Sequence, residues 1–317
     1  MTILITGGAG FIGSNLVDLL LSQSKKVVVV DNYDNFYSKE IKVKNLENAS
    51  KNNNFTFIEG DILDEELIDS IFKDYNFDIV VHLASKAGVR PSLESPKEYF
   101  DVNLIGTLNI LNNMKKANVK KMIFASSSSV YGNSTEIPFV ETNASDSPIS
   151  PYAASKRAAE LLCHTYHHLY NFDIFCLRFF TVYGPRQRPD LAISKFTKLA
   201  LEGNSIPIYG DGSMRRDYTY IDDILQGITK AIEKINGFEI FNLGENTTIS
   251  VNELVNLLGI ILKKEVQITR LPKQPGDVNI TFASLTKSKI GLEYAPKTNI
   301  EEGLRKFVSW FTKNVQN

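Results

Sequence analysis

The sequence has little of what marks secreted, membrane-spanning or nucleic-acid-binding chains. Its two cysteines, Cys163 and Cys176, lack C-x-x-C spacing, which favours a reducing compartment over a disulfide framework. No uncharged apolar run approaches the ~18 residues of a membrane span. A strand-like run at residues 1–5 leaves no room for a signal peptide. The formal net charge of -1 argues against nucleic acid or an anionic membrane as a partner. We therefore expect a cytoplasmic protein.

The first half of the chain alternates between strand-like and helix-like segments. Short, β-branched, nearly continuous apolar runs are typical of parallel strands covered on both faces, and they lie at residues 2–6, 26–31, 55–59, 79–82 and 121–125. Segments with helical periodicity lie at residues 11–21, 64–75, 96–117 and 151–169, and a further strand is expected at 173–179. This alternation predicts an α/β fold built on a Rossmann-like, doubly wound parallel sheet.

Beyond residue 180 the alternation loosens. Tyr183-Gly184-Pro185 and Tyr209-Gly210-Asp211-Gly212 indicate loops, and residues 251–263 have the pattern of an amphipathic helix. We therefore expect a Rossmann domain at residues 1–180 and a smaller C-terminal α/β substrate lobe at residues 181–317, with some segments interleaved.

The first expected strand runs directly into a glycine-rich turn at residues 7–13. Gly7 permits the tight turn, Gly10 lets the backbone approach a pyrophosphate, and Gly13 allows helix and strand to pack closely. Asp31 ends the second strand, where a carboxylate binds both ribose hydroxyls and repels a 2′-phosphate, which favours NAD over NADP. A glycine cluster that serves packing alone is the alternative.

Tyr152 and Lys156 are four residues apart and therefore share one face of a helix. A free phenol titrates at about pH 10, and a nearby ammonium favours its charged form, so the pair is a candidate base for an alcohol. Ser126-Ser127-Ser128-Ser129 follows the fifth strand, at the edge where open α/β sheets bind ligands. A serine hydroxyl there can hold a substrate oxygen beside the phenol, although a solvated turn is the alternative. The pattern predicts NAD-linked redox chemistry on a hydroxyl group.

These motifs resemble those of the extended short-chain dehydrogenase/reductases, and among them the NAD-dependent nucleotide-sugar 4-epimerases. The similarity covers essentially the whole chain and is carried by residues 6–13, Ser127 with Tyr152-x-x-x-Lys156, Arg216-Asp217-Tyr218, His82-Leu83-Ala84, residues 103–107 and Pro275-Gly276-Asp277. The resemblance implies that Tyr152 takes the proton of the sugar C4 hydroxyl while hydride passes to NAD. The 4-keto sugar then turns, and hydride returns to its other face.

The resemblance also implies individual roles. Asn103 would support the active-site helix, Arg216 would bind the nucleotide phosphate, and Asp277 would lie near the uridine ribose. The residues expected to be catalytic are Tyr152, Lys156, Ser127 and Ser128. The residues expected at the cofactor are Gly7, Gly10, Phe11, Ile12, Gly13, Asp31, Asn32, Asp61, Ile62, Leu83, Ala84, Lys86, Asn103, Tyr152, Lys156 and Phe180. The residues expected at the substrate are Ser127, Ser128, Ser129, Thr181, Arg186, Tyr209, Arg216 and Asp277. In the resembling family the helix that contains Leu104, Leu108 and Leu111 and the helix of Tyr152 form a four-helix dimer interface, so the resemblance implies a homodimer.

Ser128 and Ser129 favour epimerisation within this family. Relatives that eliminate water have an acidic residue beside the catalytic hydroxyl, and relatives that decarboxylate have a glutamate just before the Val-Tyr-Gly segment. The serines at these positions leave no carboxylic acid poised for elimination, so the ketone is reduced again.

The substrate follows from residues 179–186, which resemble the corresponding segment of UDP-glucuronate 4-epimerases; galactose-type enzymes usually have Asn in place of Thr181. Arg186 offers a planar fork for a sugar carboxylate, although a phosphate or loop role of Arg186 or Arg188 is the alternative. We expect UDP-glucuronate and UDP-galacturonate as the substrate pair. A UDP-glucose or UDP-N-acetylglucosamine 4-epimerase and a non-catalytic NAD(H)-binding regulator are the alternatives. Metal binding by His164, His167 and His168 is not expected, since no third ligand is visible.

Overall fold

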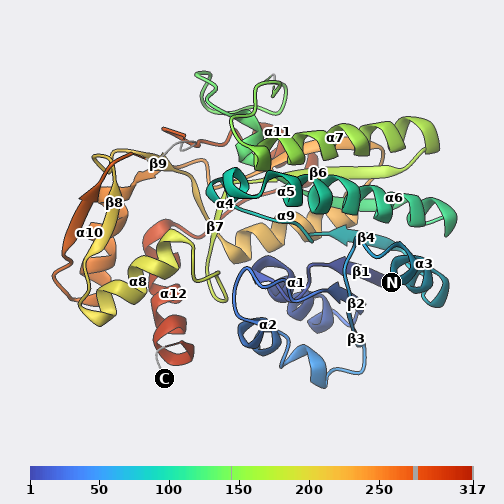
Figure 1. Ribbon diagram of the computed structural model, residues 1–317, viewed down its shortest axis with the longest axis horizontal. Coiled ribbons are helices and arrows are strands. Elements are labelled where there is room, and N and C mark those ends of the chain that lie inside the picture. Colours follow the sequence, from blue (N-terminus) through green and yellow to red (C-terminus); the bar gives the residue numbers. More distant parts are fainter. Residues whose placement is uncertain (144, 274–277, 316–317) are drawn as a thin grey trace. The chain divides into compact units, whose positions relative to one another are not determined.

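A seven-stranded sheet forms the centre of the first of two units in the computed structural model, which describes residues 1–143, 145–273 and 278–315 (Figure 1). The first unit consists of residues 1–132, 145–178 and 228–241. Its strands are β1 (Thr2–Thr6), β2 (Lys26–Asp31), β3 (Phe55–Glu59), β4 (Ile79–His82), β5 (Lys121–Ser127), β6 (Asp173–Phe179) and β11 (Phe238–Leu243), in the order β11-β6-β5-β4-β1-β2-β3. The α/β fold class is therefore as predicted.

The strand order reverses beside β1. This strand pairs in parallel with β2 on one side and with β4 on the other, so that Ile5 is opposite both Val29 and Val81. The chain builds the sheet outward through β2 and β3 and then returns to place β4 against β1. Ligands of open α/β sheets bind beyond the carboxyl ends of the strands at such a switch point. The glycine-rich turn after β1 lies at this place in the topology.

Helices connect the strands of the first unit. They are α1 (Phe11–Ser22), α2 (Lys39–Asn45), η1 (Ala49–Lys51), α3 (Glu65–Asp74), α4 (Val89–Glu94), α5 (Pro96–Phe100), η2 (Asp101–Ile105), α6 (Gly106–Lys116), η3 (Ser128–Tyr131) and α7 (Pro151–Tyr170). The expectation of one regular helix at residues 96–117 was wrong in detail, because a π-helical turn, η2, separates α5 from α6. Such turns are frequent at functional sites.

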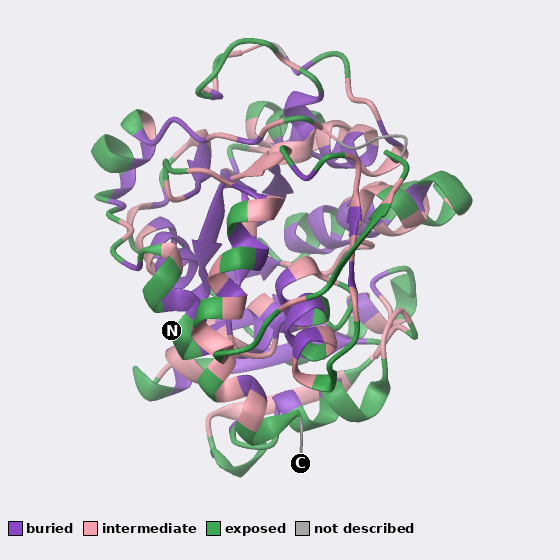
Figure 2. Ribbon diagram, turned by 90° about the vertical axis from the view of Figure 1, so that its left-hand side faces the viewer, coloured by how far each residue is buried: buried purple, intermediate pink, exposed green. Residues whose placement is uncertain are grey.

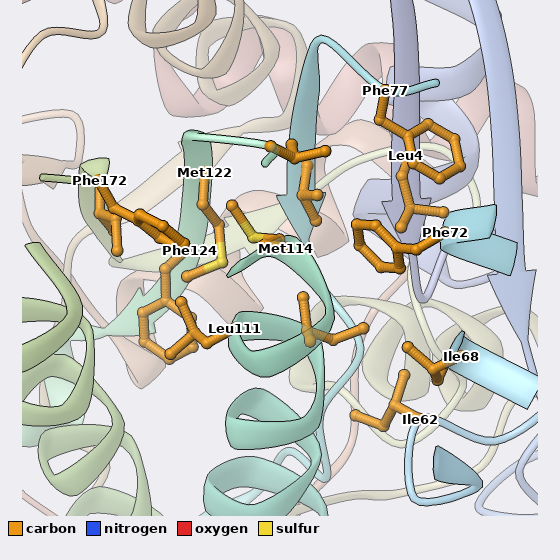
Figure 3. Packing of buried hydrophobic residues seen from close by; sticks show 14 of the residues in the cluster. Leu4, Ile62, Ile68, Phe72, Phe77, Leu111, Met114, Met122, Phe124 and Phe172 are labelled. Carbon is orange, nitrogen blue, oxygen red and sulfur yellow. The ribbon is translucent and has the colours of Figure 1, made fainter. Parts of the chain in front are cut away.

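The core of the first unit is packed between the strands and α3, α6 and α7. Figure 3 shows Leu111 and Met114 of α6 projecting toward Met122 and Phe124 of β5, and all four side chains are buried. The strands β1, β2, β4, β5 and β6 are almost wholly buried, whereas the edge strand β3 is half-buried and the helices keep exposed outer faces (Figure 2). Burial of each such side chain contributes roughly 2 kcal/mol relative to exposure. This core holds the carboxyl ends of the strands in a fixed frame.

The second unit consists of residues 133–143, 179–227 and the described part of 242–317. Its strands form three two-stranded pairs, β7 (Thr181–Tyr183) with β10 (Tyr218–Tyr220), β9 (Arg215–Arg216) with β12 (Ile249–Ser250), and β8 (Ile206–Tyr209) with β13 (Ile268–Leu271). Its helices are α8 (Ala192–Glu202), the start of α9 (Ile221–Lys234), α10 (Val251–Leu262), α11 (Thr286–Leu292) and α12 (Ile300–Asn314). No helix within the described ranges is both long and apolar enough to span a membrane.

Candidate active site

The glycine-rich turn has the backbone of a phosphate cradle. Gly7 has φ +72°, and a Cβ there would lie 2.6 Å from the backbone nitrogen of Ala84. A Cβ at Gly13 would lie 2.3 Å from the carbonyl oxygen of Gly7. A Cβ at Gly10 would approach only that same carbonyl, at 3.3 Å, which leaves open space beside the residue. The fold therefore requires Gly7 and Gly13, and Gly10 leaves room for a ligand.

The first turn of α1 also suits an anion. Gly10 is the N-cap residue and supplies no side-chain hydrogen bond to the helix, and the first turn contains no acidic residue. The backbone N–H groups at a helix start lack partners within the helix, and the helix dipole favours negative charge there. The residues present therefore fit a dinucleotide pyrophosphate at this end of α1.

Asp31 connects the end of β2 to the glycine-rich turn. Its carboxylate accepts hydrogen bonds from the backbone N–H groups of Ala9 (3.0 Å) and Tyr33 (2.9 Å). Burial raises the pKa of Asp31, and these two bonds and Lys42 oppose the rise. A carboxylate has about four acceptor sites, so two are left for ribose hydroxyls. The adjacent Asn32 donates to Asp61 (2.7 Å), which joins two of the predicted cofactor segments.

The ends of β1 and β4 are joined through a buried histidine. The His82 ring is hydrogen-bonded to the hydroxyls of Thr6 (2.6 Å) and Thr107 (3.0 Å). Burial lowers the pKa of His82 to about 3, so the ring is neutral. The Thr6 hydroxyl also accepts from the backbone N–H of Ala84 (3.2 Å). The predicted cofactor pair Leu83-Ala84 is thereby fixed next to Gly7; the roles of Thr6 and Thr107 were not predicted.

Asn103 connects the loop after β4 to the active-site helix. Its side-chain oxygen accepts from the Lys86 backbone N–H (2.8 Å), and its amide donates to the Lys86 carbonyl (3.0 Å) and to Ser155 (2.9 Å). The Lys86 ammonium forms ion pairs with Asp34 (2.9 Å) and Glu98 (3.1 Å). Asn103 thus lies where it can support α7, and it belongs to the π-helical turn η2.

Tyr152 and Lys156 lie in the first two turns of α7. This helix starts at Pro151, with the Ser150 hydroxyl accepting from the backbone N–H of Ala153 at 3.1 Å, as an N-cap does. The Lys156 side chain is 3% exposed, and its ammonium donates to the carbonyl of Ala125 at 2.8 Å. Burial lowers the pKa of Lys156 to about 7. A buried ammonium of this kind is stabilised by any anion that forms beside it.

The serine turn lies at the end of β5, the strand whose Ala125 binds Lys156. We use the term serine turn for residues 127–129. The hydroxyls of Ser127 and Ser129 are 2.5 Å apart, and the Ser127 hydroxyl also accepts from the Ser129 backbone N–H at 3.2 Å. Ser127 is buried, whereas Ser128 and Ser129 are half-buried. The sheet therefore brings the predicted hydroxyls and the predicted ammonium to one strand end.

The predicted residues of the second unit are the cofactor residue Phe180 and several substrate residues, and they have contacts of their own. Phe180 donates its backbone N–H to Leu243 (3.0 Å), and Thr181 donates its own to the carbonyl of Asp217 (3.0 Å). Arg186 has φ +68° and is half-buried, in the loop after β7. In the same loop Arg188 forms a two-pronged ion pair with Asp190 (3.0 and 2.8 Å).

Two further predicted substrate residues lie at short strands of this unit. Tyr209 ends β8 and pairs with Leu271, and Arg216 in β9 donates to the carbonyl of Arg215 at 2.9 Å. Asp277 lies outside the described residues.

Among the residues that the structure describes, histidines and acidic side chains do not form a metal-binding arrangement. Within residues 1–143, 145–273 and 278–315, no group of three or more histidine, cysteine, aspartate or glutamate side chains is placed to hold a metal ion. The His167 ring is instead hydrogen-bonded to the carbonyl of Phe172 at 2.6 Å, and His164 packs edge-on against Phe238.

Comparison with known proteins connects this geometry to a family. Residues 4–307 match a protein-family model described as GDP-mannose 4,6-dehydratase. The chain belongs to this family. A curated relative from Thermodesulfobacterium geofontis, named UDP-glucuronate 4-epimerase, is 43% identical over 99% of this chain and 97% of the relative.

Two similar solved structures share nearly the whole fold. UDP-glucuronic acid 4-epimerase from Bacillus cereus, in complex with UDP-glucuronic acid and NAD, has a TM-score of 0.93 and 35% identity, and the match covers 99% of each chain. UDP-glucose 4-epimerase from Thermotoga maritima, solved with UDP-glucose, has a TM-score of 0.93 and 37% identity over 99% of this chain and 100% of the other. The predicted family, the nucleotide-sugar 4-epimerases of the extended short-chain dehydrogenase/reductases, is confirmed.

Proposed function

We propose that this protein is an NAD-dependent UDP-sugar 4-epimerase that interconverts UDP-glucuronate and UDP-galacturonate through a transient 4-keto sugar. The observation that carries the proposal is the buried Lys156 ammonium, bound to Ala125 and one helical turn from Tyr152, at the strand end that also presents Ser127. The relatives named UDP-glucuronate 4-epimerase and the NAD-containing neighbour support it.

The glycine-rich turn and Asp31 are the residues that would hold NAD. The start of α1 would bind its pyrophosphate, and the Asp31 carboxylate would bind the adenosine ribose. When bound, NAD supplies a hydride acceptor that later returns the same hydride. Asn103 keeps α7 in place through Ser155, so the positions of Tyr152 and Lys156 relative to the cradle are fixed.

Tyr152 and Lys156 are the residues that would transfer the proton of the sugar C4 hydroxyl. Tyr152, as phenolate, takes the proton of the C4 hydroxyl, and Ser127 belongs to the same hydrogen-bond network. The low pKa of Lys156, about 7, means that its charged form is costly unless an anion lies nearby. The phenolate is such an anion, so the ammonium and the phenolate stabilise each other. Tyr152 returns the proton to the C4 oxygen when the ketone is reduced.

The serine turn disfavours elimination of water. Ser128 and Ser129 offer hydroxyls only, and the Ser129 hydroxyl is hydrogen-bonded to Ser127. Glu160, whose carboxylate accepts from Ser126 at this strand end, is buried and bound by both prongs of Arg178 (2.8 and 2.8 Å). A carboxylate held in this way is a poor proton donor, because its charged form is the stabilised one. The 4-keto sugar is therefore reduced again.

Arg186 is the proposed partner of the sugar carboxylate. The guanidinium of Arg188, the other candidate in this loop, forms a two-pronged ion pair with Asp190. A planar guanidinium binds a carboxylate through two parallel hydrogen bonds, which a neutral hexose does not require. A UDP-glucose 4-epimerase is the second candidate, and the similarity to the Thermotoga maritima enzyme favours it.

We further propose a cytoplasmic homodimer. Two leucines of α7, Leu161 and Leu169, are 54% and 57% exposed, which leaves apolar side chains on the outer face of this helix. A partner helix from a second copy would cover them.

The test uses UDP-glucuronate and UDP-glucose in separate incubations with the purified protein, without added reductant, and proton NMR of the products. Conversion of UDP-glucuronate to UDP-galacturonate supports the proposal. Conversion of UDP-glucose alone would support the second candidate, and conversion of neither would contradict the epimerase assignment for both sugars.

A further inference from the structure

A buried ion pair lies behind the serine turn. Glu160 of α7 and Arg178 of β6 are each 1% exposed. Arg178 donates from Nε to Glu160 Oε1 at 2.8 Å and from Nη2 to Glu160 Oε2 at 2.8 Å, a two-pronged contact. Removing two charges from water costs several kcal/mol for each, and apolar residues of similar volume often stabilise a fold as well or better. A contribution to stability is therefore a weak explanation for this ion pair. The contacts that it makes indicate a different role.

The ion pair contacts the chain on both sides of the serine turn. Ser126, directly before the turn, donates its hydroxyl to Glu160 Oε1 at 2.6 Å. The guanidinium of Arg178 lies 4.7 Å from the ring centre of Tyr131, two residues after the turn. Successive side chains of a strand point to opposite faces, so Ser126 faces the ion pair while Ser127 faces away from it. The pair therefore fixes both ends of the segment that presents the hydroxyls.

The same carboxylate connects the turn to the active-site helix. Glu160 follows Lys156 by four residues, so the two side chains share one face of α7. Lys156 binds the carbonyl of Ala125, and Glu160 binds the hydroxyl of Ser126. Two contacts, one helical turn apart on α7, thus hold two successive residues of β5.

The charges around Lys156 come from several elements. Burial lowers the pKa of Lys156, and Cys163 and Glu160 of α7 oppose that shift. His82 of β4 also interacts with Lys156, but its low pKa keeps it neutral. Burial acts to raise the pKa of Glu160, but Arg178 of β6, with smaller contributions from Ser126 and Arg157, lowers it below its ordinary value. Glu160 therefore supplies a negative charge that favours the ammonium form of Lys156.

We propose that Glu160 and Arg178 are positioning residues for the epimerase reaction: the pair sets the serine turn against Tyr152 and places a negative charge one helical turn from Lys156. The inference rests on the proposed function and extends it to residues that touch neither sugar nor cofactor.

The test compares kcat, KM and the pH profile of Glu160→Gln with those of the unaltered protein. Gln keeps the acceptor for Ser126 and removes the charge. We expect kcat to fall by roughly 10- to 100-fold, with KM changed by less than about 3-fold, because a small misplacement of reacting groups lowers the rate more than binding. We also expect the basic limb of the kcat profile to move to lower pH by about one unit, because Lys156 loses the charge that favours its protonated form. Glu301→Gln, which removes half of an exposed ion pair with Arg305 on α12, is the control and should change neither.

A second variant separates positioning from folding. Glu160→Gln leaves Arg178 buried and without its partner charge, which destabilises proteins. The double variant Glu160→Met with Arg178→Met removes both charges, so it is expected to melt near the unaltered protein while kcat stays low. A folded double variant with unaltered kcat and pH profile would overturn the inference.

A third readout does not depend on turnover. The titration of Lys156, followed by NMR of ¹⁵N-labelled lysine side chains, should move to lower pH in Glu160→Gln. If the unaltered protein epimerises no UDP-sugar, the proposed function fails while this titration still tests the charge relation. An unmoved titration together with unaltered kcat would refute the positioning role and leave the function intact.

Discussion

The two units hold their candidate residues in different ways. In the first unit the glycine-rich turn and the candidate catalytic side chains are fixed by strand ends, by close backbone contacts at Gly7 and Gly13, and by buried hydrogen bonds such as that from Lys156 to Ala125. In the second unit, Arg186 lies on a loop with left-handed backbone and Tyr209 lies on a two-stranded pair. From this difference we infer that the first unit determines the chemistry of the reaction and the second determines which sugar is accepted. Variants in each unit can break or sharpen that division.

The largest effect is expected from Tyr152→Phe in the first unit. Removal of the phenol hydroxyl removes the base, so epimerisation should slow by about 10³-fold for every UDP-sugar, within the usual range for general acid–base catalysis. NMR of the product gives the rate, and the absorbance of released nucleotide gives the NAD content, which should be unaltered. A selective loss for one sugar would contradict a purely chemical role of the first unit.

Two glycines with similar positive φ, one in each unit, provide a test variant and a matched control for the proposed NAD-binding turn. Gly7→Ala places a Cβ 2.6 Å from Ala84 at φ +72°, whereas Gly203→Ala, at φ +74°, meets nothing within 4 Å. Both variants have the cost of left-handed backbone, about 1 kcal/mol. Gly7→Ala alone should also weaken NAD binding, by roughly 10- to 100-fold, because the turn must shift.

Fluorescence titration with NADH measures that difference. Equal NAD affinity in the two glycine variants would show that the close contact at Gly7 is not required for the cradle.

Arg186→Ala in the second unit should change the choice of sugar. Loss of a fork that binds a carboxylate should raise KM for UDP-glucuronate by about 10- to 30-fold, since hydrogen bonds to charged groups contribute roughly 1.5–3 kcal/mol, discounted for solvent access. The values for UDP-glucose should change little. Arg188→Ala is the control, because Arg188 is bound to Asp190. Equal losses for both sugars would assign Arg186 to the nucleotide rather than to the carboxylate.

Lys156→Met should lower activity and raise the free energy of unfolding. The folded-state pKa of Lys156, about 7, lies below its ordinary value of 10.5, so the unfolded chain binds more protons between these values. The lysine is therefore destabilising below about pH 7, and this cost disappears as the pH rises toward 10.5. The variant should be more stable by about 2–4 kcal/mol near pH 7, with an advantage that shrinks at higher pH.

Urea unfolding of the cofactor-free protein at pH 7 and pH 10 measures this advantage. A constant difference between the two pH values would contradict the assignment of the shift to Lys156.

Much of the first unit could be predicted because local chemistry specifies it. The strands at residues 2–6, 26–31, 55–59 and 79–82 were predicted with the bounds observed, since buried parallel strands are continuous apolar runs. Periodicity did not reveal the π-helical turn at Asp101–Ile105, because the helix continues on both sides of it. Nor did it show that residues 228–241 return to the first unit and add β11 to its sheet.

The missed site residues are those that depend on contacts between distant segments. Glu160 and Ser126 are 34 residues apart, and Thr6 and His82 are 76 apart. No spacing in the sequence indicates these pairs. By contrast, Tyr152 and Lys156 belong to one helix, where the distance along the chain determines the distance in space.

The most direct test of the central claim follows one hydrogen atom. UDP-glucuronate labelled with deuterium at C4 is incubated with the protein in ordinary water, and the UDP-galacturonate formed is analysed by NMR. If hydride leaves C4 and returns from the same bound cofactor, the product will retain deuterium at C4. Loss of the label to solvent would contradict hydride transfer, and with it the account of this protein as an NAD-dependent 4-epimerase.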